Sequence, residues 1–238
     1  MSFTKNTRIR TSLFVNVAGL LLAATGCCSS MRTTKAPPHI AREDIEWGRA
    51  WVTGVNQTDR PHVLLIGDSI TEAYSAGVEK RLTGIAYISR LATSKSLGDP
   101  AYLREVVTVL GNTPFDVVHF NNGMHGVGYS ETEYERDFAK LIRILQRRAP
   151  KAKLIGATTT PKRRGGQLDQ FPLFNDRIVV RNRIARTLLE KANLQVDDLF
   201  ALVESHPDFY SPDGIHFNST GIDAEAAQVA DQILAVLK

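Results

Sequence analysis

The most constraining feature of this chain is a regular alternation between short apolar runs and helix-like segments. Five runs have the length and composition of buried strands. They are HVLLIG (62–67), IAYISR (85–90), FDVVHFN (115–121), KLIGATT (153–159) and the weaker LQVDDLF (194–200). Nearly continuous apolar strands that alternate with helices predict a parallel sheet with helices on both faces. The expected fold class is therefore α/β, a three-layer sandwich around a central parallel sheet of about five strands.

The segments between these runs carry helix signals of their own. Ser130 and Glu133 form a capping box before a segment with apolar residues on one face. Asp99 and Pro100 have the pattern of an N-cap followed by a first-turn proline. Helices are expected from Thr71 onward, after Asp99, and over 131–148, 177–192 and 221–237.

The N-terminus has the form of an export signal. Three basic residues, Lys5, Arg8 and Arg10, precede the apolar run LFVNVAGLLLAATG. This run is shorter than the roughly 20 apolar residues that span a bilayer. It ends at Cys27 in a sequence that resembles the bacterial lipoprotein cleavage box, in which the cysteine is acylated. An ordinary secretory signal, cut nearby, is the alternative.

The chain is accordingly divided into four parts. Residues 1–27 form the export signal, and the small, polar residues of 28–42 form a tether. Residues 43–60 are expected to form a helical strap with Trp47 and Trp51, four apart, on one face. Residues 61–238 form the main domain. The predicted location is periplasmic or extracellular, with attachment to a bacterial membrane if Cys27 is lipidated.

The net charge argues against a nucleic-acid partner, and the positions of the cysteines argue against an internal disulfide. The formal net charge is +4, and the leader supplies three positive and no negative residues, which leaves 4 − 3 = +1 for the rest. Bulk charge therefore does not suggest a nucleic-acid partner. Both cysteines, Cys27 and Cys28, lie at the end of the leader, so the domain has no internal disulfide. The sequence shows no metal-ligand cluster and no phosphate-binding glycine loop, so no metal or cofactor is expected.

A candidate nucleophile follows the first strand. In IGDSIT, Gly67 permits a tight turn and places Ser69 at the carboxyl end of the strand, where open parallel sheets bind ligands. A serine hydroxyl is a weak nucleophile without a base, and the base must itself be oriented. SPDGIHFNSTG supplies both, because Asp213 and His216 are three residues apart and can share one loop.

An oxyanion hole requires donors that point at the developing negative charge. The amide of Gly98, in SLGDP, is one candidate because it precedes a predicted helix. The segment HFNNGMHG supplies three others, namely His125, Asn121 and Asn122.

These blocks together resemble the SGNH/GDSL hydrolase family. The resemblance rests on IGDSIT, SLGDP and SPDGIHFNSTG and covers residues 61–238. It implies the flavodoxin-like SGNH hydrolase fold, with Ser69, Asp213 and His216 as catalytic residues. It also implies an oxyanion hole that includes the amides of Ser69 and Gly98. The third block of the family is usually G-x-N-D, and here His125 stands where the asparagine is expected, with Asn121 and Asn122 as alternative donors.

Three residues are candidates for substrate binding. Asp68 belongs to the serine block, and Arg163 and Arg164 belong to TTTPKRRGG, which follows the fourth strand with Lys162. These cations can receive an acidic substrate, or they can be ordinary solvated loop charges. Arg177, Arg181 and Arg186 are expected to form the polar face of a helix.

The resemblance implies a serine esterase for short-chain esters, often acetyl groups on carbohydrates, that acts through an acyl-enzyme. The expected partner is a small-molecule or glycan ester. Two alternatives stay open: an O-acyltransferase with the same triad, and a non-catalytic glycan-binding or envelope protein with the same fold. The oligomeric state is not predicted.

Overall fold

A computed structural model describes residues 2, 42–111 and 113–238 of the chain. Apart from Ser2, the predicted export signal, its lipidation site Cys27 and the tether up to residue 41 lie outside the described residues. The part from residue 42 onward is built around one six-stranded sheet with the order β1-β3-β2-β4-β5-β6. The strands are β1 (Gly48–Trp51), β2 (His62–Gly67), β3 (Tyr87–Thr93), β4 (Val117–Phe120), β5 (Lys153–Ala157) and β6 (Gln195–Asp197).

Strands β2 to β6 are parallel, which confirms the predicted parallel sheet of five strands. All six residues of β2 are buried, as expected for the central strand of a sheet covered on both faces. The predicted strands differ from the observed ones by only a few residues at their ends.

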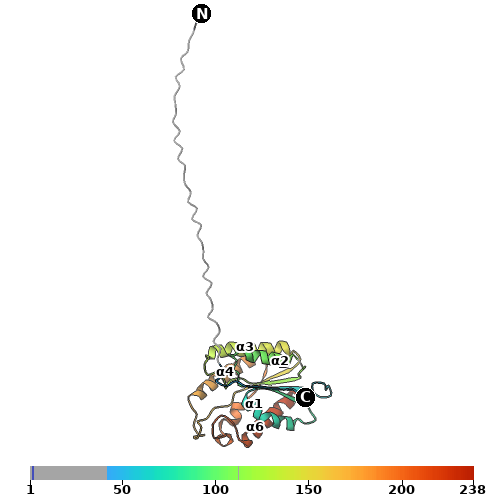
Figure 1. Ribbon diagram of the computed structural model, residues 1–238, viewed down its shortest axis with the longest axis vertical. Coiled ribbons are helices and arrows are strands. Elements are labelled where there is room, and N and C mark those ends of the chain that lie inside the picture. The colour runs from blue at the N-terminus through green and yellow to red at the C-terminus, as the bar shows by residue number, and fades with distance from the viewer. Residues whose placement is uncertain (1, 3–41, 112) are drawn as a thin grey trace. The chain divides into compact units, whose positions relative to one another are not determined.

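The sheet lies between two helical layers (Figure 1), which confirms the three-layer sandwich. One layer packs apolar residues of three helices against one face of the sheet, and these are α2 (Pro100–Leu110), α3 (Glu131–Arg148) and α4 (Phe174–Lys191). The opposite layer contains α1 (Ser69–Arg81), α5 (Leu199–Glu204) and α6 (Ser219–Leu237). A short 3-10 helix, η1 (Pro207–Phe209), precedes α6.

Local signals explain where several helices begin. The predicted capping box is present, because Ser130 Oγ accepts from the Glu133 backbone and the Glu133 side chain accepts from the Ser130 backbone. Asp99 caps α2 by accepting from Ala101 N at 2.7 Å, and Pro100 is its first residue. Both predicted starts are confirmed.

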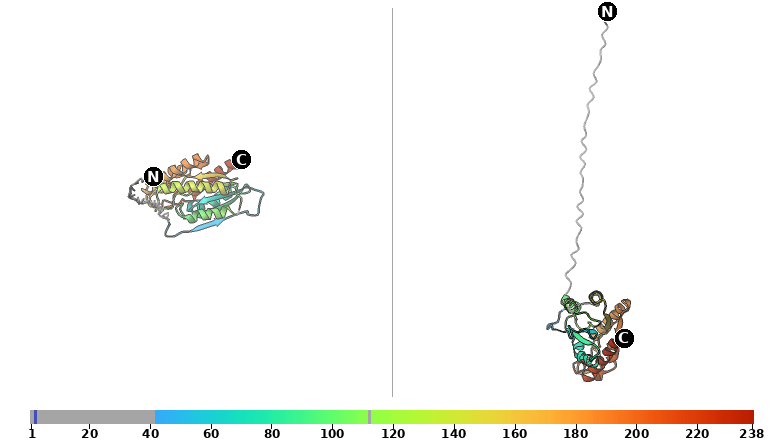
Figure 2. Two further views of the ribbon diagram at one scale, coloured as in Figure 1. Left: turned by 90° about the horizontal axis from the view of Figure 1, so that it is seen from above. Right: turned by 90° about the vertical axis from the view of Figure 1, so that its right-hand side faces the viewer.

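The prediction of a helical strap over 43–60 is wrong. Gly48–Trp51 forms β1, which pairs antiparallel with β3. Figure 2 shows β1 at the outer edge of the sheet. The spacing of Trp47 and Trp51 fits a helical face, but hydrogen bonding to β3 outweighs this local pattern. The segment is therefore part of the sheet.

The topology places a switch point next to β2. In the sheet, β2 lies between β3 and β4. Helix α1 connects β2 to β3 on one side of it, and α2 connects β3 to β4 on the other side. Helices α1 and α2 lie on opposite faces, so the segments that follow β2 and β3 diverge at the carboxyl end of the sheet. Ligands bind at such switch points in open α/β sheets.

Within the described residues, no helix combines the length and apolar character needed to cross a membrane.

Candidate active site

Ser69 is the first residue of α1, directly beyond the carboxyl end of β2. Asp68 caps the helix, with its Oδ1 accepting from Ile70 N at 3.0 Å. A Cβ atom at Gly67 would lie 2.0 Å from Thr71 Oγ1, so the turn from β2 into α1 requires glycine. The half-buried Ser69 thus sits in the first helical turn, where backbone N–H groups have no acceptor within the helix.

Ser69, His216 and Asp213 form a continuous hydrogen-bonded chain. His216 Nε2 lies 3.0 Å from Ser69 Oγ, and His216 Nδ1 lies 2.6 Å from Asp213 Oδ2. The other carboxylate oxygen of Asp213 accepts from the backbone N–H groups of Ile215 and His216 at 2.8 and 3.0 Å. A ring that donates from Nδ1 to a carboxylate leaves Nε2 to accept the serine proton.

Hydrogen bonding also determines the charge of Asp213. Burial alone would raise the pKa of this carboxyl group, but hydrogen bonds from the His216 ring and from the backbone of Ile215 and His216 outweigh it. The net effect lowers the pKa of Asp213 below its usual 3.8. Asp213 is therefore ionised at neutral pH and can stabilise a positively charged imidazole.

The loop that carries this pair requires a glycine and rests on the segment after β5. Gly214 has a φ of 71°, and a Cβ atom there would lie 2.4 Å from the Arg163 carbonyl oxygen. Arg163 N donates to Gly214 O at 2.7 Å. The loop then enters α6 through the N-cap Asn218.

A cavity of about 260 Å³ opens in front of Ser69. Its walls come from the N-terminal segment, the loop after β4, the segment after β5, the start of α4 and the loop of Asp213 and His216, called the catalytic loop below. The lining residues are Glu43, Ser69, Met124, His125, Val127, Lys162, Phe174, Ile215 and His216.

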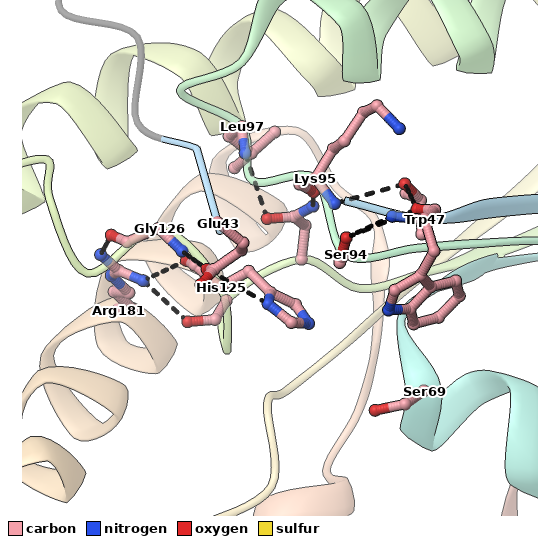
Figure 3. A network of polar contacts seen from close by, with 12 residues as sticks. Glu43, Trp47, Ser69, Ser94, Lys95, Leu97, His125, Gly126 and Arg181 are labelled. Atoms are coloured by element: carbon pink, nitrogen blue, oxygen red, sulfur yellow. Dashed lines mark hydrogen bonds and ion pairs between the residues drawn. The ribbon is translucent and has the colours of Figure 1, made fainter. Parts of the chain in front are cut away.

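His125 enters this cavity from the loop after β4. Its Nδ1 lies 3.3 Å from Glu43 Oε1, and the same oxygen accepts from Gly126 N at 3.1 Å. Arg181, which is fully buried, donates to the carbonyl oxygens of Gly123, His125 and Gly126 at 2.8 to 2.9 Å. Figure 3 shows the His125 ring between the Glu43 carboxylate and the side on which Ser69 lies.

Comparison with known proteins decides the family. The model of the GDSL-like Lipase/Acylhydrolase family matches residues 65–224. The chain belongs to the GDSL-like lipase/acylhydrolase family. It is thus an SGNH-type serine hydrolase, a carboxylic ester hydrolase. A search of curated proteins gives no match.

Solved structures of GDSL-like and related hydrolases share the fold. An acetyl xylan esterase, AlAXEase, is 22% identical with a TM-score of 0.59, covering 72% of this chain and 99% of its own. A carbohydrate acetylesterase family member from Sinorhizobium meliloti is 16% identical with a TM-score of 0.60, covering 74% and 99%. A lipase/acylhydrolase from Enterococcus faecalis is 18% identical with a TM-score of 0.58, covering 74% and 96%.

The two asparagines of the third block connect parts of this GDSL-like fold. Asn121 Nδ2 donates to Ala157 O at 2.8 Å and to Thr159 Oγ1 at 3.1 Å, so both amide hydrogens are used to join β4 to β5. Asn122 donates to Lys95 O and accepts from Leu97 N, which ties the third block to the loop after β3. Neither asparagine lines the cavity of Ser69.

Gly98 lies in the turn that leads into α2. It is half-buried, and a Cβ atom there would lie 3.3 Å from the Tyr129 ring. Gly98 is not among the residues that line the cavity. Asn122 of the third block bonds Lys95 and Leu97, and these contacts hold the loop of Gly98 against the third block.

The structure places the three predicted substrate-binding residues outside the cavity walls. Asp68 is buried as the cap of α1. Arg163 is only 3% exposed, and its guanidinium donates to the carbonyl oxygens of Leu168 and Glu204. Arg164 is exposed and bonds two nearby glutamines. The contacts of Asp68 and Arg163 are those of residues that hold the fold, contrary to the prediction. The cation that lines the cavity is Lys162, with its Nζ 5.4 Å from the centre of the Phe174 ring.

Glu43 was not predicted at the site, and the prediction for Arg181 is wrong. Arg181 was expected on a polar helix face, but it falls in the buried stripe of α4. That stripe consists of Asn175, Ile178, Arg181, Asn182, Ala185 and Leu189. Its helical periodicity is a signal that could have identified Arg181 as buried. Glu43 carries no local signal, because its partner is 82 residues away.

No group of three or more His, Cys, Asp or Glu side chains within the described part of the chain could hold a metal ion.

Proposed function

We propose that this acylhydrolase is an exported serine esterase that hydrolyses short-chain esters, chiefly acetyl esters of carbohydrates, through an acyl-enzyme. The observation that carries the proposal is the hydrogen-bonded chain from Ser69 through His216 to Asp213. Nucleophile, base and orienting acid are the three parts that such a mechanism needs.

In acylation, Ser69 Oγ forms a bond to the ester carbonyl carbon while its proton moves to His216 Nε2. The resulting imidazolium is stabilised by the ionised Asp213. The tetrahedral intermediate then collapses, the bond to the leaving alcohol breaks, and His216 returns the proton to that alcohol. The acyl group stays on Ser69 as an ester.

In deacylation, water takes the place of the alcohol. His216 accepts a proton from the water as its oxygen bonds to the acyl carbon. The second tetrahedral intermediate releases the carboxylic acid, and the proton on His216 returns to Ser69 Oγ. Nothing is consumed other than ester and water.

The negative oxygen of each intermediate is bound by three donors in this proposal. Two are the amides of Ser69 and Gly98, which the family resemblance implies although Gly98 is not among the lining residues, and the side-chain donor is the His125 ring. His125 is favoured over Asn121 and Asn122 because it lines the cavity of Ser69, whereas the amide groups of both asparagines are engaged elsewhere.

The shape of the site supports a short acyl group. A cavity of about 260 Å³ lies at the small end of ligand sites, which commonly span about 300 to 1,000 Å³. Its walls combine apolar side chains with polar groups such as Lys162 and Glu43. This mixture suits an ester of a small acyl group with a sugar, which carries several further hydroxyl groups. The likeness in fold to an acetyl xylan esterase and a carbohydrate acetylesterase agrees with this substrate class.

Export is proposed from the leader sequence alone. The basic and apolar residues that end at Cys27 support secretion, and acylation of Cys27 would hold the enzyme at a bacterial membrane.

The test compares hydrolysis of p-nitrophenyl acetate, butyrate and octanoate, followed by acetate release from an acetylated xylo-oligosaccharide. Rates are expected to fall with acyl length. Ser69→Ala and His216→Ala should each lower kcat at least about 10⁴-fold. Thr108→Ala, which removes an exposed hydroxyl on α2, is the control and should leave kcat unchanged.

Three results would contradict the proposal. Retention of substantial turnover by folded Ser69→Ala would remove the assigned nucleophile. Faster turnover of octanoate than acetate would replace the short-chain substrate class. Transfer of the acetyl group to an added sugar in preference to water would make the protein an O-acyltransferase.

A further inference from the structure

Glu43 contacts the third block from outside the stretch that the family model matches. The match begins at residue 65, whereas Glu43 belongs to the segment that precedes β1. Its Oε1 lies 3.3 Å from His125 Nδ1 and accepts from Gly126 N at 3.1 Å (Figure 3). The carboxylate also lines the cavity of Ser69.

We propose that Glu43 is a positioning residue that makes His125 a cationic donor to the oxyanion. The inference rests on the proposed function, in which His125 is the third donor. A carboxylate beside Nδ1 favours a ring that carries a proton on Nδ1, because a bare nitrogen lone pair facing a carboxylate is repulsive. The ring can then donate from Nε2 only when both nitrogens are protonated.

The surroundings of the ring suit this arrangement. The titratable and charged groups that share its cavity are Glu43 from the N-terminal segment, Lys162 from the segment after β5 and His216 from the catalytic loop. Arg181 of α4 holds the backbone of the same loop through His125 O. His125 is therefore fixed at its backbone and at Nδ1, and the residue lines the cavity of Ser69.

A charged donor changes what the site can do. Oxyanion stabilisation depends on donors oriented before the reaction, in a site where water does not screen them. An imidazolium supplies both a hydrogen bond and a positive charge to the developing oxyanion, whereas the amide of an asparagine supplies only the hydrogen bond. Glu43 compensates that positive charge while the substrate is absent.

The alternative is that Glu43 only fastens the N-terminal segment. That segment has a second attachment, since Arg42 Nε lies 3.3 Å from Asp99 Oδ2. Glu43→Gln can still accept from Gly126 N through its amide oxygen, so the substitution removes the charge and leaves a means of fastening.

The experiment measures kcat and KM for p-nitrophenyl acetate with the full-length protein. Glu43→Gln is made in the parent and in a His125→Asn background, which restores the usual family donor. Asp44→Asn is the matched control, because Asp44 is an exposed acid on the same segment. Circular dichroism and thermal unfolding verify that each variant is folded.

Glu43→Gln is expected to lower kcat about 10-fold or more in the parent, with KM within about twofold. In the His125→Asn background the same change should alter kcat less than about twofold, and Asp44→Asn should have no effect in either. An equal loss in both backgrounds, or an unchanged kcat in folded Glu43→Gln, would overturn the inference.

A second measurement separates this inference from the proposed function. The ¹⁵N resonances of the His125 ring are recorded in Ser69→Ala protein, which needs no turnover. Glu43→Gln should change the Nδ1 resonance, and Asp44→Asn should not. If the parent has no esterase activity, the proposed function fails, and the ring resonances still show whether the Glu43 carboxylate interacts with His125 Nδ1. An Nδ1 resonance that Glu43→Gln leaves unchanged contradicts the inference.

Discussion

His216 Nε2 lies 3.0 Å from Ser69 Oγ although the two residues are 147 positions apart. Ser69 is held by the turn from β2 into α1, and His216 by the loop that enters α6. Helices α1 and α6 pack in the same layer, with apolar residues of both in one cluster. The triad thus depends on the packing of the first and last helices of the domain.

The Asp213 carboxylate should be essential to the rate at neutral pH. Burial alone would raise the pKa of Asp213, but hydrogen bonds from the His216 ring and from the backbone lower it below its usual 3.8, so the group is ionised there. Asp213→Asn should lower kcat/KM about 10⁴-fold, because the amide favours the wrong tautomer of His216. kcat/KM for p-nitrophenyl acetate at pH 7 measures the loss, and circular dichroism verifies that the variant is folded. A folded Asp213→Asn variant that keeps the kcat/KM of the parent would contradict this role.

Arg181 should be essential to the loop that carries His125. It is fully buried and binds three carbonyl oxygens, a geometry that a lysine ammonium on a flexible stem does not reproduce. Arg181→Lys is expected to lower the free energy of unfolding by about 2 to 4 kcal/mol and to lower kcat. Arg183→Lys, an exposed neighbour on α4, is the control and should change neither. Urea unfolding and kcat for p-nitrophenyl acetate test this, and equal stability of the two variants would contradict it.

Gly126 should be more sensitive to substitution than Gly166, which also has a positive φ. Its φ is 83°, and a Cβ atom would lie 2.0 Å from Tyr129 Cε1 and 2.6 Å from Ser96 Cβ. Gly166 has a similar φ of 75° with open space around it, so Gly166→Ala measures the backbone strain alone.

Gly166→Ala should cost about 1 kcal/mol of unfolding free energy, and Gly126→Ala about 2 to 4 kcal/mol. Gly126→Ala should also lower kcat, because it displaces the loop beside His125. Chemical unfolding of both variants, with kcat as the second readout, checks the difference. An equal loss of unfolding free energy in the two variants would contradict this prediction, because it would mean that the contact at Gly126 adds nothing to the backbone strain.

Glu225 on α6 should make the protein less stable as pH rises. It is fully buried, and neither carboxyl oxygen has a hydrogen-bond partner among the described residues. Burial, followed by the nearby Asp68 and Asp197, raises the pKa of Glu225 well above its usual 4.5. The native state therefore keeps this proton at a pH where the unfolded chain has lost it. The stability that Glu225 contributes is full below about pH 4.5 and declines above it, until the native group also ionises.

Glu225→Gln should remove this decline. One proton corresponds to a slope of roughly 1 to 1.5 kcal/mol per pH unit, so the variant should gain stability relative to the parent between pH 5 and 7. Asp231→Asn, at an exposed position of the same helix, should leave the slope unchanged. Unfolding free energies at three or more pH values test this, and parallel curves for parent and Glu225→Gln would contradict it.

Local signals predicted the parallel sheet and most helices well. The composition of buried strands such as β2 predicts them, and short sequence motifs predict the helix caps at Ser130 and Asp99. Ser69, Asp213 and His216 were predicted as a triad because each follows from local sequence and a known chemical requirement, and the structure brings them within hydrogen-bonding distance.

The failures share a different physical origin. Strand β1 exists because β3 offers it a hydrogen-bonding edge, and Glu43 reaches the site because the chain before β1 passes the loop after β4. Arg163 was expected to bind substrate or to be a solvated loop charge, but it is buried and donates to the carbonyl oxygen of Glu204, 41 residues away. Each depends on contacts between segments far apart in sequence, which composition and periodicity do not contain.

The position of β1 also governs aggregation. Strand β1 covers β3, whose residues are mostly buried, and its own four residues are exposed and include Arg49. A fragment that begins at residue 55 would lose β1, keep β2 to α6, and leave β3 as a bare, apolar edge. Such edges pair with strands of other molecules. The short β1 thus protects the solubility of the enzyme, and insoluble fragments of this kind would reflect the missing strand.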